Sequence, residues 1–178
     1  MSQADSPIIK LGITNANYYN CGLLVINWIE LPTEEEILRK KLAEMEIDQD
    51  DDYIVLEVNA PFKCTFPDHL DIFELNNKLN RLGCLDPAIL TAISKYDTLP
   101  LMRIVDIALD KKYVIYENVT NEEDLGRRLY QEHQLPFQIP KDLEKYIDFQ
   151  TLGHEACLKD AIRFIPDMHI AEKILCAS

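Results

Sequence analysis

Glycine and serine are scarce in this chain of 178 residues, and neither forms a catalytic or phosphate-binding motif. The glycines are Gly12, Gly22, Gly83, Gly126 and Gly153. They are spaced too widely for a P-loop or for the G-x-G-x-x-G turn that binds dinucleotides. The four serines, at positions 2, 6, 94 and 178, occur in no nucleophile elbow. The sequence therefore contains no motif typical of a nucleotide-dependent enzyme or of a serine hydrolase.

Long apolar runs are also absent. The longest apolar stretch, CGLLVINWI at residues 21–29, is far shorter than the roughly 20 residues that a membrane span needs. The first ten residues contain no basic segment leading into an apolar one, as a secretory signal would. We therefore expect a soluble protein of the cytoplasm with no membrane partner.

Metal-binding and disulfide patterns are missing as well. The five cysteines are odd in number, widely separated and never arranged as C-x-x-C, which fits a reducing compartment. His154 and Glu155 begin the sequence HEACLKD, which lacks both the second histidine of a zincin helix and the P-C-x-x-C of a deaminase. Residues 48–59 resemble a calcium loop, but Tyr53 replaces the required glycine and Asn59 the closing glutamate. We expect no metal and no cofactor.

Acidic residues dominate the charge. The chain has 31 Asp and Glu against 18 Lys and Arg, a net charge of -13. This charge opposes binding to nucleic acid, whose phosphates require a basic surface, and it favours a basic partner. The excess is concentrated in residues 1–62, with twelve acids and four bases, whereas residues 63–110 have seven and five and residues 111–178 have twelve and nine.

The first third of the chain has the pattern of a small α/β domain. Residues 8–14 and 23–31 are predicted strands, joined by the polar turn NANYYNCG. A helix is predicted over residues 33–45, with Thr33 as N-cap and Glu36 completing a capping box, and a further strand over residues 53–58.

Closely spaced helices follow, and then a second α/β pattern. Asp68 is the predicted cap of a helix ending near Gly83, and Asp86 with Pro87 begins the next. Strand alternation returns at residues 112–119, before a helix that begins at Asn121, a helical segment at 139–147 and closing strands at 161–165 and 169–175. We therefore predict an α+β chain of three parts: an α/β domain (1–62), a helical domain (63–110) and a second α/β domain (111–178).

The acidic residues fall into two kinds. Glu34–Glu36 and Glu122–Asp124 lie at predicted helix starts, where negative charge complements the helix dipole by roughly 0.3–1 kcal/mol each. The cluster Asp48, Asp50, Asp51 and Asp52 follows a helix and gains nothing from its dipole. A solvated loop and a surface that competes with DNA for a basic groove both remain compatible with this cluster.

Two longer motifs remain to be explained. The first is ITNANYYNCGLLVINWIELP, with Ile13, Asn15, Tyr19, Asn20, Gly22, Leu24, Val25, Trp28 and Pro32 as its characteristic residues. The second is PKDLEKYIDFQTLGHE, with Pro140, Leu143, Tyr146, Ile147, Asp148, Gly153 and Glu155. At these positions both motifs resemble those of the ArdA antirestriction family, and the order of the predicted elements also agrees, over roughly residues 8–175.

The resemblance implies an elongated, dimeric, non-catalytic chain whose carboxylates imitate the phosphates of bent B-form DNA. The implied partner is a type I restriction-modification enzyme, through its methyltransferase and specificity subunits. Such proteins are carried by conjugative mobile elements and act in the recipient cytoplasm. The candidate partner-binding residues are Glu34, Glu35, Glu36, Glu44, Asp48, Asp50, Asp51, Asp52, Glu122, Glu123, Asp124, Asp142, Glu144 and Asp148.

Two other hypotheses remain open at this point. The same scaffold could serve as an accessory protein of a mobile element that binds a different basic or DNA-binding protein, with the weakly charged residues 63–110 as an apolar contact. Alternatively, His154, Glu155 and Asp148 could act as acid-base groups of an enzyme.

Overall fold

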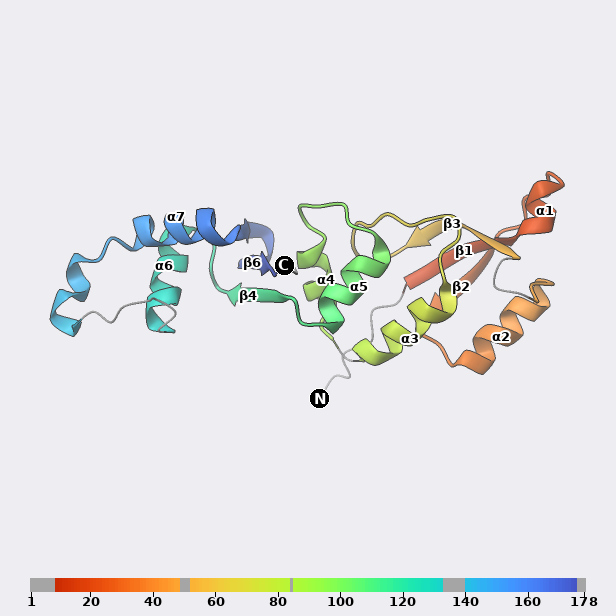
Figure 1. The fold of residues 1–178 in the computed structure, drawn as a ribbon, viewed down its shortest axis with the longest axis horizontal. Coiled ribbons are helices and arrows are strands. Elements are labelled where there is room, and N and C mark those ends of the chain that lie inside the picture. Colours follow the sequence, from red (N-terminus) through yellow and green to blue (C-terminus); the bar gives the residue numbers. More distant parts are fainter. Residues whose placement is uncertain (1–8, 49–51, 84, 133–139, 176–178) are drawn as a thin grey trace. The chain divides into compact units, whose positions relative to one another are not determined.

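The protein has a mixed α+β fold that divides into two compact units, Met1–Asp110 and Lys111–Ser178. The computed structural model describes residues 9–48, 52–83, 85–132 and 140–175, and Figure 1 shows their helices and strands. Each unit contains one three-stranded sheet in this part of the chain. The α+β class predicted from the sequence is confirmed, while the three-domain division, with its boundary at residue 62, stays a prediction.

The sheet of the first unit is antiparallel, with the order β2-β1-β3. Its strands are β1 (Ile9–Asn15), β2 (Asn27–Leu31) and β3 (Tyr53–Asn59). All three were expected from alternating apolar residues, although β2 begins four residues later than the predicted residue 23. The register between β1 and β3 shifts once, between Gly12 and Ile13.

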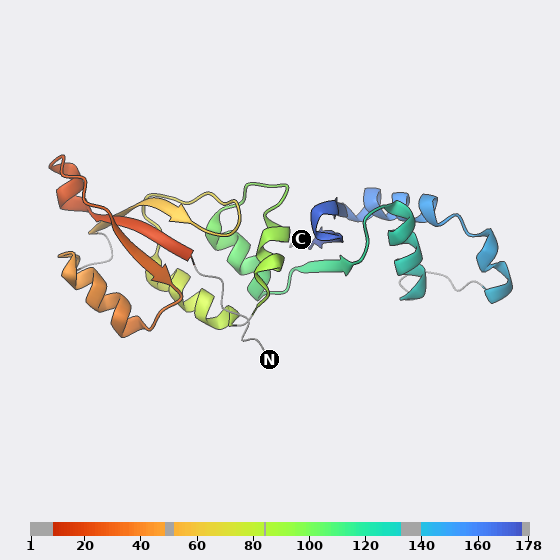
Figure 2. The ribbon, with the colours of Figure 1, turned by 180° about the vertical axis from the view of Figure 1, so that it is seen from behind.

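The helices of this unit are α1 (Ala16–Asn20), α2 (Glu35–Glu44), α3 (Ile72–Leu82), α4 (Pro87–Ile93) and α5 (Leu101–Leu109). In Figures 1 and 2, α2 and α3 lie along the same side of the sheet. The helix α4 begins as predicted, because Asp86 accepts a hydrogen bond from the backbone of Ala88 and Pro87 occupies the first turn.

The first unit buries its apolar residues between these elements. The largest fully buried side chains come from the strands and from α2, α3 and α4, and they include Ile9, Leu11, Ile13, Ile29, Leu31, Leu38, Ile72, Leu75, Leu79, Leu90 and Ile93. In α3 the buried residues recur at the spacing of one helix face, which is the pattern that predicted this helix.

The predicted capping box at Thr33 is wrong. Helix α2 begins at Glu35, Glu34 is the N-cap residue, and no side chain caps it. Thr33 has a different role: its backbone N–H donates to Asn76 Oδ1 at 2.8 Å, and its carbonyl accepts from Asn76 Nδ2 at 2.9 Å. A buried amide 43 positions away therefore fixes this part of the backbone, which local sequence patterns cannot reveal.

The start of α3 is fixed by a similar contact between side chain and backbone. Asp71, and not the predicted Asp68, caps the helix by accepting from the backbone N–H of Glu74 at 2.8 Å. The hydroxyl of Tyr53, a buried residue of β3, donates to Leu70 O at 2.8 Å and accepts from Ile72 N at 3.2 Å. The sheet thus holds the residues that lead into α3.

The second unit combines a small antiparallel sheet of order β4-β6-β5 with two α-helices. Its elements are β4 (Tyr113–Glu117), α6 (Glu122–Gln131), the 3-10 helix η1 (Lys141–Tyr146), α7 (Phe149–Asp160), β5 (Arg163–Ile165), the 3-10 helix η2 (Pro166–Met168) and β6 (Ile170–Ile174). Its core consists of Tyr116, Val119, Leu125, Leu129, Ile162 and Ala171. The helix at Asn121 and the strands near residues 113–117, 163–165 and 170–174 confirm the predicted elements.

Helix α7 was not predicted, because it lacks a regular apolar stripe. Its fully buried residues are only Phe149 and Gly153. A local signal did exist, since Asp148 accepts hydrogen bonds from the backbone N–H of Thr151 at 3.0 Å and from its hydroxyl at 2.8 Å. This is the ordinary pattern of an N-cap residue.

Two glycines allow α6 and α7 to approach closely. A Cβ added at Gly126 would overlap the carbonyl oxygen of Phe149, and one added at Gly153 would overlap the carbonyl oxygen of Glu122. The backbones of the two helices are therefore in direct contact at this crossing. No residue larger than glycine fits either position without moving a helix.

We expect Gly153→Ala to destabilise the second unit. Alanine normally favours a helix over glycine by about 1 kcal/mol, but the overlap with Glu122 should outweigh this gain and cost more than about 2 kcal/mol in net stability. Gln150→Ala is the matched control, because Gln150 is exposed on the same helix and its replacement should leave stability unchanged or slightly higher. Hydrogen exchange measured in residues 111–178 should be faster in Gly153→Ala than in the wild-type protein and unchanged in Gln150→Ala. Equal protection in the two variants would contradict the close helix contact.

We also expect Asn76→Leu to destabilise the first unit. The substitution removes both hydrogen bonds to Thr33 and leaves its backbone N–H without its partner, at a cost of about 1–3 kcal/mol. Asn80→Ala is a control at the same carbonyl, because exposed Asn80 donates only one longer bond of 3.2 Å to Thr33 O and should cost about 0.5 kcal/mol. Chemical denaturation should separate the two variants; similar losses would show that the Asn76 bonds are not the main restraint.

Candidate functional site

The buried side chain of Asn15 organises one end of the first unit. Its Oδ1 accepts from the backbone N–H of Asn17 at 2.8 Å and of Tyr18 at 3.4 Å, and so caps α1. Its Nδ2 donates to the carbonyls of Met45 at 3.2 Å and Glu46 at 2.8 Å, just beyond the end of α2. One amide therefore joins the start of α1 to the end of α2.

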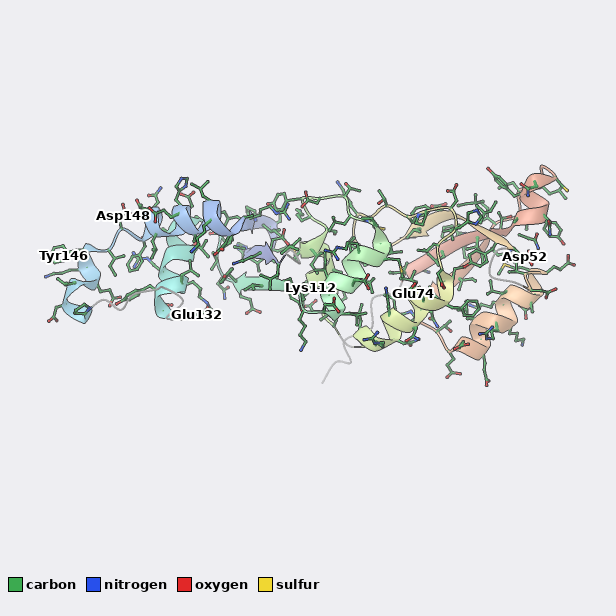
Figure 3. The ribbon with its side chains drawn as sticks, viewed as in Figure 1. Asp52, Glu74, Lys112, Glu132, Tyr146 and Asp148 are labelled. Carbon is green, nitrogen blue, oxygen red and sulfur yellow. The ribbon has the colours of Figure 1, made fainter. Side chains whose placement is uncertain are left out.

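The residue before β3 is also bonded to the start of α1. The backbone N–H of Ala16, the first residue of α1, donates to the carbonyl of Asp52 at 2.8 Å. The Tyr18 hydroxyl donates to a carboxylate oxygen of Glu46, and this contact raises the pKa of Tyr18. Figure 3 shows Asp52 at the same end of the first unit as α1. Glu46, which precedes the acidic cluster, and Asp52, which ends it, are thus both bonded to α1.

The predicted acidic residues of the first unit surround α2 and its C-terminal end. Glu34, Glu35 and Glu36 lie at the helix start and are exposed, and Glu35 forms an ion pair with Arg39 at 2.6 Å. Glu44 is the exposed last residue of the helix, and Asp48 is exposed beyond it. Asp50 and Asp51 lie outside the described residues.

The predicted acidic residues of the second unit have more local partners. Glu122 contacts His154 at 2.7 Å, and Glu123 pairs with Arg127 at 2.7 Å. Asp124 accepts from the Asn121 side chain at 2.7 Å and from the Thr120 hydroxyl at 3.0 Å. These three acids therefore have partners on or just before α6, or on the facing helix α7.

Asp148 is also a structural residue in this unit. The hydrogen bonds from the Thr151 backbone and hydroxyl stabilise its carboxylate and hold its pKa below the usual value. Asp142 and Glu144, on η1, are instead exposed. Figure 3 shows Asp148 at the start of α7 and Tyr146 at the end of η1.

Six predicted site residues make no ion pair or side-chain hydrogen bond within the described ranges. They are Glu34, Glu36, Glu44, Asp48, Asp142 and Glu144, and all six are exposed. Their carboxylates are available to a basic partner without first breaking an internal contact. We define the four from the first unit, Glu34, Glu36, Glu44 and Asp48, as the α2 acidic group.

The first unit also has an exposed apolar surface that was not predicted from the sequence. Residues 23–26 are Leu, Leu, Val and Ile, and all four are exposed although they precede a strand. Tyr19 and Trp28 are exposed as well. Residues 23–26 were predicted to begin a strand, but they lie before β2. The run of apolar residues beside a polar turn was the feature of the sequence that could have indicated an exposed apolar surface.

The structure gives no support to an acid-base or metal site in its described part. Asp148 is used in capping, His154 contacts Glu122 of another helix, and Glu155 is exposed. No group of three or more His, Cys, Asp or Glu side chains among the described residues could hold a metal ion. A cleft of about 420 Å³ in the first unit is lined by residues that include Lys63 and Lys95, but by no carboxylate, histidine or cysteine.

Two of the described cysteines are also poor candidates for nucleophiles. Cys21, Cys64 and Cys157 are free thiols. Burial raises the pKa of Cys64 and of Cys157, so the reactive thiolate form of each is disfavoured at neutral pH. In the same part of the chain, no helix has the length and apolar content required to cross a membrane.

Comparison with known families agrees with the two sequence motifs. The family described as "Antirestriction protein (ArdA)" matches residues 13–171, which is nearly the whole chain. A search of curated proteins found no match. The matched range includes Asn15, the α2 acidic group and the α6–α7 crossing described above. The chain therefore belongs to the ArdA family of antirestriction proteins.

Proposed function

We propose that this protein inhibits a type I restriction-modification enzyme by occupying its DNA-binding groove as an acidic DNA mimic. Membership of an antirestriction family supports the general function. The observation that supports the mechanism is the set of exposed carboxylates that have no internal partner among the described residues, four of which form the α2 acidic group. The protein acts by binding and carries out no catalytic step of its own.

The physical basis is competition for the same basic side chains. A DNA duplex presents about one negative charge per 1.7 Å of its axis, and its binding proteins neutralise this charge with Lys and Arg. Carboxylates held on a folded surface can pair with the same groups, and an exposed carboxylate without an internal ion pair loses no existing contact when it does so. Binding of this kind should be fast and should weaken as salt rises.

The partner and the biological setting are part of the same proposal. The methyltransferase core of a type I enzyme, made of specificity and modification subunits, contains the DNA groove that the mimic occupies. We propose that the protein acts as a homodimer in the cytoplasm of a cell receiving a conjugative element. The net charge of -13 is unfavourable for direct binding to the DNA itself.

We expect neutralising three clustered carboxylates to weaken binding to the methyltransferase. In the triple variant Glu36→Gln, Glu44→Gln and Asp48→Asn, each lost charge pair should cost about 0.5 kcal/mol, so the dissociation constant should rise roughly tenfold at low salt. Competition against a labelled duplex with the recognition sequence, repeated at several salt concentrations, measures both affinity and its salt dependence. The variant should also have a shallower salt dependence than the wild-type protein.

A second triple variant controls for net charge alone. Asp68→Asn, Glu117→Gln and Glu155→Gln remove the same charge from exposed positions that lie apart in the chain and outside the predicted site. This variant should keep most of the affinity. Equal losses in both variants would show that only total charge matters, and absence of wild-type binding at low salt would refute the proposed mechanism.

A further inference from the structure

Four consecutive apolar side chains are exposed between α1 and β2. The exposed fractions are 57% for Leu23, 65% for Leu24, 48% for Val25 and 39% for Ile26. Tyr19, on α1, and Trp28, on β2, are exposed by 47% and 46%. Single exposed apolar residues are common on protein surfaces, but six within ten positions indicate an interaction surface. We call residues 19, 23–26 and 28 the apolar group.

The backbone of the apolar group is held in a defined geometry. Gly22, with φ of 79°, follows α1, and its N–H donates to Tyr19 O at 3.0 Å. The N–H of Leu23 donates to Tyr18 O at 2.9 Å. These two bonds form a Schellman motif, which fixes the direction in which the chain leaves the helix. The apolar side chains are therefore presented by a hydrogen-bonded turn, whose helix is itself anchored by Asn15.

Gly12 provides space for part of this group on the sheet. A Cβ at Gly12 would lie 3.2 Å from Cγ2 of Ile26, 3.3 Å from Cβ of Glu57 and 3.4 Å from Cη2 of Trp28. These three side chains therefore converge over the same backbone position. The exposed acidic residue Glu57 therefore leaves the sheet at the same place as the two apolar side chains.

Other acidic residues are bonded to α1, the helix that leads into the apolar group. Glu46 accepts the hydrogen bond of the Tyr18 hydroxyl, and the backbone carbonyl of Asp52 accepts from the N–H of Ala16, the first residue of α1. Asp48 lies between them in the chain and belongs to the α2 acidic group. Protein interfaces commonly have an apolar centre that contains aromatic residues, surrounded by a charged rim. This end of the first unit has that composition, with an acidic rim.

The acidic residues indicate which of two possible partners binds the apolar group, a second copy of the chain or a basic protein. A second copy of the chain would bring the same acidic residues together, and residues 1–62 contain twelve acids against four bases. Like charges at an interface oppose association, whereas a basic surface would be attracted. Charge complementarity therefore favours a partner whose apolar pocket is surrounded by Lys and Arg.

We propose that the apolar group is an anchor that inserts into an apolar pocket beside the basic DNA groove of the target methyltransferase. This inference rests on the proposed function and adds a contact that DNA itself does not make. The acidic residues supply the salt-dependent part of the affinity, and the apolar group supplies a part that salt does not screen. Aromatic residues at the centre of such contacts often contribute most of the binding energy.

The experiment compares the wild-type protein with the variant Leu23→Ser, Leu24→Ser in binding to a purified type I methyltransferase. Both side chains are more than half exposed, so their replacement should leave folding intact, as a denaturation curve would verify. The dissociation constant should rise at least about tenfold, because the variant buries two fewer leucine side chains on binding. The slope of affinity against salt concentration should remain that of the wild-type protein.

Leu158→Ser is the matched control, because Leu158 is 74% exposed on α7 in the other unit and outside the apolar group. It should bind as the wild type does. If wild-type protein binds with the expected salt dependence and the leucine double variant binds equally well, the anchor is refuted while the DNA-mimic function stands. If the wild type does not bind at low salt, the proposed function itself fails.

Sedimentation of the free proteins tests the alternative occupant. The double variant should keep the oligomeric state of the wild-type protein. A change to a smaller species in the double variant alone would show that the apolar group joins two copies of the chain, and it would overturn the anchor.

Discussion

The arrangement of the candidate surface depends on the hydrogen bonds of one buried amide, that of Asn15. Its oxygen caps α1, while its nitrogen holds the carbonyls of Met45 and Glu46 after α2. An aspartate could still cap α1, but it could not donate to these carbonyls, and an alanine could do neither. The same residue therefore holds the residues directly after α2 beside α1, the helix that leads into the apolar group. This dual role gives a physical reason for Asn15 in the first family motif.

Helix starts with local signals were predictable, and those fixed by distant residues were not. Asn121 and the acids after it indicated α6, and Asp86 with Pro87 indicated α4, because caps act within three residues. Thr33 also had a local capping pattern, but Asn76, 43 positions away, binds its backbone. Helix α7 escaped prediction for another reason: its closest packing is through Gly153, and a glycine leaves no mark in an apolar pattern.

The candidate site shows a similar limit. Counting acids gave the candidate residues, but it could not separate a carboxylate that caps a helix from one that is available. Asp124 and Asp148 are engaged with Thr120, Asn121 and Thr151, whereas Glu44 and Asp48 are exposed. The sequences T-N-x-x-D and D-x-x-T were local signs of the engaged pair. Whether the other carboxylates are available could be seen only in the structure, because it depends on which Lys and Arg side chains lie close to them.

The proposed DNA mimic has few available carboxylates, so it must obtain affinity from more than charge. In the part of the chain that the structure describes, six predicted site residues are exposed and have no internal partner, far fewer than the phosphates along a DNA-binding groove. Exposed charge pairs are also screened within about 8 Å at physiological salt, so their contribution to the binding free energy is smaller in a cell than at low salt. Burial of apolar surface is not screened in this way, and its relative contribution grows as salt rises. An apolar group placed directly beside the acidic residues would therefore let a modestly charged protein compete with DNA, whose backbone offers no comparable contact.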